Sequence, residues 1–215
     1  EINNLSTILD VDAHAKLNEL VRSKGRSATV NNNVIRRNVV LAMFKCVESD
    51  LFHAPSKMAP LLNTIPREQE GEIVNDILKA DTSIIVRASG GMGKSVLAQR
   101  LASLLPEGSE TVVFDGFAGG DYRSPSNPRH KHSHGLVHLA NTLASRGLCD
   151  PMLPASGVEP DVYHRAFKRR LIQASSKIRQ QKPSAILLVV LDAADNSMMA
   201  ANLRHEQCFA QDLLK

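Results

Sequence analysis

The stretch Ala88-Ser89-Gly90-Gly91-Met92-Gly93-Lys94-Ser95 decides how the rest of the sequence is interpreted. It follows a short β-branched run, residues 83–87, and opens a segment with helical periodicity, residues 94–105. Glycines in such a turn permit positive φ angles and a close approach of the backbone to a ligand. Backbone N–H groups at a helix start, with the positive end of the helix dipole, form a phosphate site. We therefore predict an anion-binding loop between a buried strand and a helix.

The loop has the spacing of the Walker A motif, with Ala88 at the position of the first glycine. Lys94 is expected to neutralise β- and γ-phosphate charge, and the Ser95 hydroxyl is expected to bind Mg²⁺. The alternative is a glycine-rich turn that carries a surface lysine. The order of strand, loop and helix is the context that the motif requires. The residues expected to contact a nucleotide are Ser89, Gly90, Gly91, Met92, Gly93, Lys94, Ser95 and Val96.

A second acidic site is expected where the apolar run 185–191 ends. A run that is apolar throughout indicates a strand buried on both faces, as in parallel sheets. Asp192 ends this run, which is the Walker B arrangement, and would hold Mg²⁺ directly or through water. Asp195 would orient or deprotonate an attacking water, so these two aspartates and Lys94 are the predicted catalytic residues. The alternatives are that Asp192 caps a helix and that Asp195 is a cap or a solvated side chain.

The alternation of strands and helices from about residue 81 predicts an α/β domain with a parallel sheet. Its predicted elements are residues 83–87, 94–105, 111–115, 134–146, 161–180 and 185–191. The preceding part of the chain is expected to be all-helical, with helices at 11–23, 33–47 and 67–80. Three prolines mark residues 48–66 as a connector. We therefore divide the chain into a helical lead-in, residues 1–65, and a nucleotide-binding part, residues 66–215.

The composition is that of an ordinary globular protein, with 43% hydrophobic and 22% charged residues. No apolar run approaches the roughly 20 residues of a membrane helix, so no membrane partner is expected. No signal peptide is visible at the start of the sequence. Cys46, Cys149 and Cys208 are far apart and lack zinc-site spacing. They are predicted to be reduced thiols in a cytoplasmic protein.

The net charge of +4 is unevenly distributed along the chain. Residues 121–182 contain eleven basic and four acidic side chains, a local excess of +7. Such an excess can attract nucleotides or nucleic acid, or can be the solvated face of helices. Arg129-His130-Lys131-His132 with His134 is predicted to be a flexible loop, and a metal clip or a contact to phosphate, nucleic acid or a neighbouring subunit is the alternative. Asp115 would either lie near a γ-phosphate or stabilise a turn.

These motifs resemble those of STAND NTPases, the signal-transducing class of P-loop NTPases that contains the NACHT and NB-ARC families. The doubled glycine Gly90-Gly91 resembles the GxGGxGK[ST] loop of this class, and Asp192–Asp195 resembles its DxxD ending of Walker B. Pro66-Arg67-Glu68 resembles the arginine–glutamate motif that precedes the core, which adds Arg67 to the nucleotide-binding residues. A strand between the Walker A and Walker B strands in sequence is typical of the additional-strand class of P-loop ATPases. The long, histidine-containing segment 116–160 looks more like that of bacterial STAND ATPases of antiviral defence than that of the animal or plant receptors of this class.

The resemblance implies a switch whose cofactors are ATP or ADP and Mg²⁺. In this class, a trigger ligand permits exchange of ADP for ATP, and self-oligomerisation then activates an effector, here in anti-phage or innate-type defence. We expect residues 66–215 to be the N-terminal part of an incomplete domain, in which ATP hydrolysis is slow or incomplete. The alternatives are a P-loop kinase or other phosphotransferase with Asp115 as its base, and a nucleic-acid-binding ATPase that uses the basic segment. Nucleic acid is therefore a possible partner but not the expected one.

Overall fold

The computed structural model describes residues 15, 18–19, 21–23, 36–154 and 157–214. They form a mixed α/β fold with two parallel strands, β1 (Glu110–Asp115) and β2 (Leu187–Asp192). The α-helices are α2 (Arg37–Met43), α3 (Gln69–Lys79), α4 (Lys94–Leu104), α5 (His132–Ser145), α6 (Pro160–Gln181), α7 (Ala194–Asn202) and α8 (Phe209–Leu213). The structure also contains two short 3-10 helices, η2 (Glu48–Leu51) and η3 (Ala118–Arg123).

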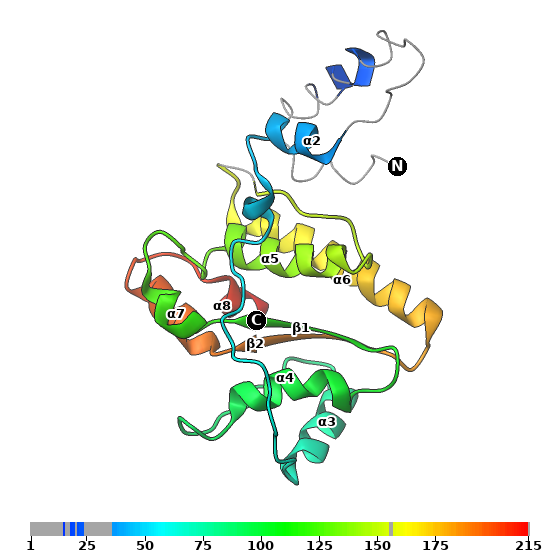
Figure 1. The fold of residues 1–215 in the computed structure, drawn as a ribbon, viewed down its shortest axis with the longest axis vertical. Helices are drawn as coiled ribbons and strands as arrows, with labels where there is room; N and C mark the ends of the chain where they lie inside the picture. Colours follow the sequence, from blue (N-terminus) through cyan, green and yellow to red (C-terminus); the bar gives the residue numbers. More distant parts are fainter. Residues whose placement is uncertain (1–14, 16–17, 20, 24–35, 155–156, 215) are drawn as a thin grey trace.

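The sheet lies between two layers of helices (Figure 1). Helices α5 and α6 cover one face, and α3 and α4 lie on the other. The core between the sheet and α5 contains Val112 and Phe114 from β1 and Leu136 and Leu139 from α5, all buried. Helix α6 contributes Phe167 to the same core, because its apolar side chains lie along one face. Burial of these side chains fixes both helices against the sheet.

The two strands end at the same edge of the sheet. In the parallel register, Glu110 lies opposite Leu187 and Asp115 lies opposite Asp192. The chain crosses from β1 to β2 through α5 and α6 on one face, which is the long connection that parallel strands need. The C-terminal residues of the two strands, Asp115 and Asp192, therefore lie next to each other.

The predicted buried strand at residues 83–87 is wrong. This run has no strand conformation, and Ile84, Ile85 and Val86 are 40%, 58% and 44% exposed. A β-branched run becomes a strand only where a neighbouring edge supplies backbone partners, and β1–β2 is the only pairing among the described residues. Residues 187–191 of β2 are likewise half-buried, not fully buried as predicted.

Most predicted helices are confirmed within a few residues. Helices α3, α4, α5 and α6 correspond to the predicted segments, whereas the predicted helix at 33–47 is reduced to α2. The predicted helix at 11–23 lies largely outside the described residues, and α7 and α8 were not predicted. No helix in the described ranges is long and apolar enough to cross a membrane.

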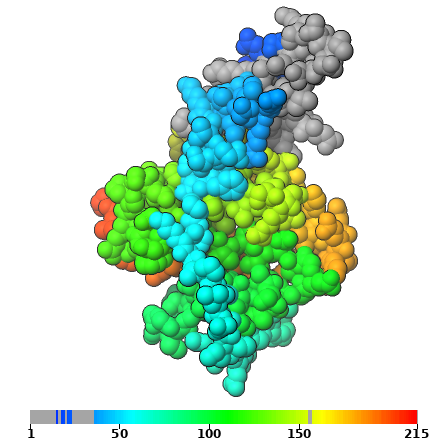
Figure 2. Space-filling model, in the orientation of Figure 1, coloured from blue at the N-terminus to red at the C-terminus, as the bar shows by residue number. Residues whose placement is uncertain are grey.

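The connector between α2 and α3 is fastened to the rest of the fold. Figure 2 shows it, in cyan, running over the surface of the molecule. Asn141 of α5 donates hydrogen bonds to the carbonyls of Leu51 and Met152 at 2.9 and 2.8 Å. Arg100 of α4 donates to the Thr64 hydroxyl near the other end of the connector. The connector is thus held along its length by side chains of two helices on opposite faces of the sheet.

Replacement of Gly135 by alanine is expected to destabilise the fold. A Cβ atom at this position of α5 would overlap the ring of Phe209, which is fully buried and packs edge-on against Phe114. Overpacking of this kind costs about 1–3 kcal/mol. Urea denaturation measures the change in the free energy of unfolding.

The control for this prediction is Gly71→Ala. Gly71 lies within α3, and nothing lies within 4 Å of an added Cβ there. Because alanine is the better helix former, this variant should gain roughly 0.5–1 kcal/mol. Equal effects of the two substitutions would contradict the packing of α8 on Gly135.

Candidate functional site

The glycine-rich loop turns directly into α4. Gly91 and Gly93 have φ angles of +77° and +79°, a left-handed conformation that glycine adopts without strain. The Lys94 ammonium donates hydrogen bonds to the carbonyls of Ala88 and Ser89 at 2.7 and 3.0 Å. The lysine therefore folds back over its own loop, and its cation stays at the start of the helix.

Ser95 and Asp192 meet at the end of β2. The Ser95 hydroxyl donates to Asp192 Oδ2 at 2.8 Å, which joins residues 97 positions apart in the chain. Asp192 is 8% exposed, and burial raises the pKa of its carboxyl. The nearby Asp115 carboxylate raises this pKa further, while the Ser95 hydrogen bond and the Lys94 ammonium oppose the shift. The predicted Walker A and Walker B residues are thus brought together.

The backbone around Asp192 is tightly packed. Gly116 N donates to the Asp192 carbonyl at 2.8 Å, and a Cβ on Gly116 would lie 2.5 Å from the Ala193 carbonyl oxygen. Ala193 has a φ of +53°, an uncommon conformation for alanine that turns the chain into α7. Ala193 is the N-cap of α7, and no side chain caps this helix. Asp192 therefore does not serve as a helix cap, which was the alternative explanation for it.

Asp115 stabilises a turn and holds the connector. Its Oδ1 accepts hydrogen bonds from Phe117 N at 3.1 Å and Ala118 N at 2.7 Å. Its Oδ2 accepts from Lys57 N at 2.9 Å and from the Ser56 hydroxyl at 3.4 Å. Both carboxylate oxygens are therefore engaged by groups of the protein, in agreement with the turn interpretation of this residue.

A cleft of about 620 Å³ lies between α4, the strand ends and the connector. Its floor contains Lys94, Ser95, Asp192 and Asp195. The connector wall consists of Lys57, Met58, Ala59, Pro60, Leu61, Leu62 and Thr64. The predicted site residue Val96 also lines the cleft. The sequence analysis did not identify this wall, because proline-containing connectors carry no motif that indicates where they dock.

Arg67 lies against the glycine-rich loop. Its Nη1 donates to the Met92 carbonyl at 2.9 Å. Its guanidinium also lies 3.2 Å from the position that a Cβ on Gly93 would take, so a side chain there would crowd it. The structure thus brings Arg67 to the loop, 25 residues away in sequence.

The oxygen atoms at the Ser95–Asp192 contact suit Mg²⁺. A hydroxyl and a carboxylate are hard ligands, and Mg²⁺ in nucleotide sites takes few protein ligands because phosphate oxygens and waters complete its shell. The described residues contain no group of three or more His, Cys, Asp or Glu that could hold a metal by itself. This donor set therefore fits a metal that arrives with a phosphate, and not a metal held by protein ligands alone.

The prediction of a flexible basic loop at Arg129–His134 is wrong. Arg129, His130 and His132 are 1%, 0% and 4% exposed. The Arg129 guanidinium donates four hydrogen bonds to the carbonyls of Ala54, Pro55 and Asp115.

Two of the histidines pair with carboxylates from the last part of the chain. His130 Nε2 lies 2.7 Å from a Glu206 oxygen, and His132 Nε2 lies 2.9 Å from an Asp212 oxygen. Arg170 of α6 is also buried, where it donates to the carbonyls of Asp150, Pro151 and Ala166. Part of the basic excess therefore lies inside the protein. Sequence analysis missed this because the partners lie far away along the chain.

No protein-family model matches the chain, and no curated protein matches it significantly.

Stability should fall as the pH is lowered from about 6.5. Burial, with the charges of His53, Lys131 and His130, lowers the pKa of His134 to about 4, and burial with Arg129 and His53 lowers that of His138 to about 4. The unfolded chain binds these protons near pH 6.5 and the folded chain does not, so the stabilisation is complete above pH 6.5 and decreases towards pH 4. Each histidine contributes a slope of up to about 1.4 kcal/mol per pH unit.

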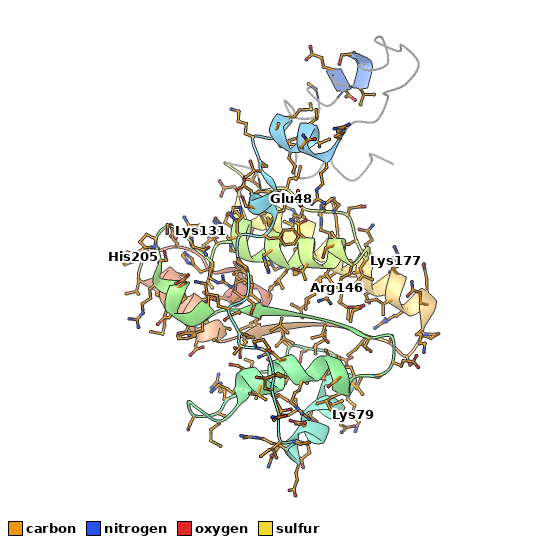
Figure 3. All side chains as sticks on the ribbon, viewed as in Figure 1. Glu48, Lys79, Lys131, Arg146, Lys177 and His205 are labelled. Atoms are coloured by element: carbon orange, nitrogen blue, oxygen red, sulfur yellow. The ribbon has the colours of Figure 1, made fainter. Side chains whose placement is uncertain are left out.

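Urea denaturation between pH 5 and pH 7 measures this slope. His134→Gln and His138→Gln should each flatten it. His205, labelled in Figure 3, is exposed, and His205→Asn is the matched control for loss of a histidine. A slope that is the same in all four proteins would contradict the burial of these histidines as neutral rings.

Proposed function

We propose that this chain binds ATP or ADP with Mg²⁺ in the cleft beside α4 and acts as the nucleotide-binding part of a STAND-type switch. The observation that carries the proposal is the 2.8 Å hydrogen bond between Ser95 and Asp192, with the Lys94 ammonium at the same helix start. Three chemical groups that a Mg²⁺-nucleotide site needs thus lie together: N–H groups at a helix start, a lysine, and a hydroxyl paired with a carboxylate.

Each residue has a distinct role in the proposed site. The N–H groups of Gly90 to Ser95 hold the β-phosphate, and Lys94 leaves the loop carbonyls to bind the β- and γ-phosphates. Ser95 and Asp192 hold Mg²⁺, which neutralises phosphate charge when bound. Asp195, exposed at the start of α7 and lining the cleft, positions the attacking water.

The connector supports a switch rather than a simple binding site. It leads directly into Arg67, which contacts the glycine-rich loop, and its Lys57 N–H group contacts Asp115 at the end of β1. A nucleotide that changes either contact changes how the connector is held, and a ligand shifts an equilibrium only through such differential contacts. Self-oligomerisation and activation of an effector in defence belong to this proposal through the resemblance to STAND NTPases.

The kinase alternative receives less support from the same cleft. A kinase base must accept a proton from the acceptor hydroxyl, and Asp115 was the candidate. Both of its oxygens already accept hydrogen bonds from backbone N–H groups. We therefore retain the nucleotide switch as the single proposed function.

Lys94→Ala should weaken binding of ATP and of ADP by about 100-fold, because a charge-assisted contact to the phosphates is lost. Isothermal titration calorimetry in the presence of Mg²⁺ measures both affinities. Lys79, labelled at the end of α3 in Figure 3, is the matched control, and Lys79→Ala should bind both nucleotides normally. Unchanged affinity in Lys94→Ala would refute the proposed site.

Asp192→Asn should reduce affinity in the presence of Mg²⁺ more than in its absence. The amide keeps the size of the side chain but removes the negative charge that binds the metal. Calorimetry with and without a chelator gives the ratio of the two affinities, which should fall by about 10-fold. The exposed Asp76 of α3 provides the control, since Asp76→Asn should leave the ratio unchanged. An equal loss under both conditions would mean that Asp192 holds the fold and not the metal.

A further inference from the structure

We propose that Lys57 of the connector binds the terminal phosphate of the nucleotide and thereby distinguishes ATP from ADP. This inference rests on the proposed nucleotide site. Lys57 and Lys94 are the two lysines among the described residues that line the cleft, and three aspartates line it with them. A triphosphate brings further negative charge into a cleft whose carboxylates outnumber its ammonium groups, so a second cation near its end would be strongly favoured.

The backbone of Lys57 is fixed at the end of β1. Its N–H group donates to Asp115 Oδ2 at 2.9 Å, and Arg129 donates to the carbonyls of Ala54 and Pro55, three and two positions earlier in the chain, at 3.0 Å each. Asp115 lies opposite Asp192 in the register of the two strands, and its charge contributes to the raised pKa of Asp192. Since paired strands are about 4.8 Å apart, Lys57 is anchored one strand away from the expected metal site.

The side chain of Lys57, in contrast, is held only weakly. Its ammonium pairs with Asp121, and the two side chains are 50% and 45% exposed. An exposed ion pair of this kind contributes about 0–1 kcal/mol and is easily exchanged. A terminal phosphate carries up to two negative charges, so it competes well with a single carboxylate.

The stem of Lys57 borders the cleft beside Gly119. The Lys57 stem passes 3.9 Å from the position that a Cβ on Gly119 would take, and Gly119 lines the same cleft with a φ of +63°. The four-carbon lysine stem is flexible. Its ammonium can therefore turn from Asp121 into the cleft while its backbone stays on Asp115.

The consequence is that the connector responds to the third phosphate. With a diphosphate, Lys57 stays on Asp121 of η3. With a triphosphate, it leaves Asp121 and joins the connector to the nucleotide, so η3 loses a contact and the cleft gains one. Lys57 lies within the helical lead-in, residues 1–65, and the connector joins it through η2 to α2.

Calorimetry with Mg²⁺ and either ADP or the non-hydrolysable β,γ-imido analogue of ATP tests this proposal. Lys57→Ala should lower affinity for the analogue about 10-fold and change affinity for ADP less than about two-fold. Lys57→Arg should retain most of the discrimination. Asp121→Asn removes the competing carboxylate, so it should raise affinity for the analogue and leave ADP binding unchanged.

The controls separate this inference from the proposed function. Lys182→Ala removes another exposed lysine ion pair, with Glu107, at the opposite end of the strands, and should bind both nucleotides normally. Loss of affinity for both nucleotides to the same degree, or for neither, in Lys57→Ala would overturn the role of Lys57 while leaving the nucleotide site intact. Binding of neither nucleotide by the wild-type chain would overturn the proposed function itself. A thermal melt of each variant checks that it is folded.

Discussion

The parallel pairing of β1 with β2, in the register that sets Asp115 opposite Asp192, is the constraint on which the rest of the site depends. It places two carboxylates side by side at one sheet edge, where like charges repel each other. Each carboxylate is therefore stabilised by hydrogen-bond donors or by a cation. At Asp115, the donors are backbone N–H groups of the connector and of the turn that follows β1. At Asp192, the side-chain donor is the Ser95 hydroxyl at the end of the glycine-rich loop. This hydrogen bond uses one carboxylate oxygen, so the carboxylate can still bind a metal.

The different surroundings of the two aspartates define what the cleft can do. Asp115 is fully used in holding the connector, so its role is to fix the wall of the cleft. Asp192 has a raised pKa and a single side-chain partner from the loop, so a divalent cation would be a favourable addition there. One sheet edge thus holds the connector at Asp115 and provides the proposed metal site at Asp192. A ligand at Asp192 can therefore influence how the connector is held.

The sequence predicts the local parts of this arrangement well, because they depend on short-range rules. Glycines at 91 and 93 permit the left-handed backbone of the loop, and the alternation of strands and helices predicts α5 and α6. Ser95 and Asp192 are both predicted to bind Mg²⁺, and the structure brings their side chains within 2.8 Å of each other. The features that the sequence does not reveal depend on partners that are distant along the chain. Residues 83–87 have strand propensity without a strand neighbour, and Arg129 is buried because carbonyls of residues 54 and 55 surround it.

The central claim is that Lys94, Ser95 and Asp192 form one Mg²⁺-nucleotide site. A crystal structure of the chain with Mg²⁺ and the β,γ-imido analogue of ATP tests it most directly. The account predicts the β-phosphate on the N–H groups of Gly90–Ser95, with Mg²⁺ bound by the Ser95 hydroxyl and by Asp192 directly or through water. A nucleotide bound elsewhere, or an Asp192–Ser95 contact that remains closed with the analogue bound and no metal beside it, would contradict the account.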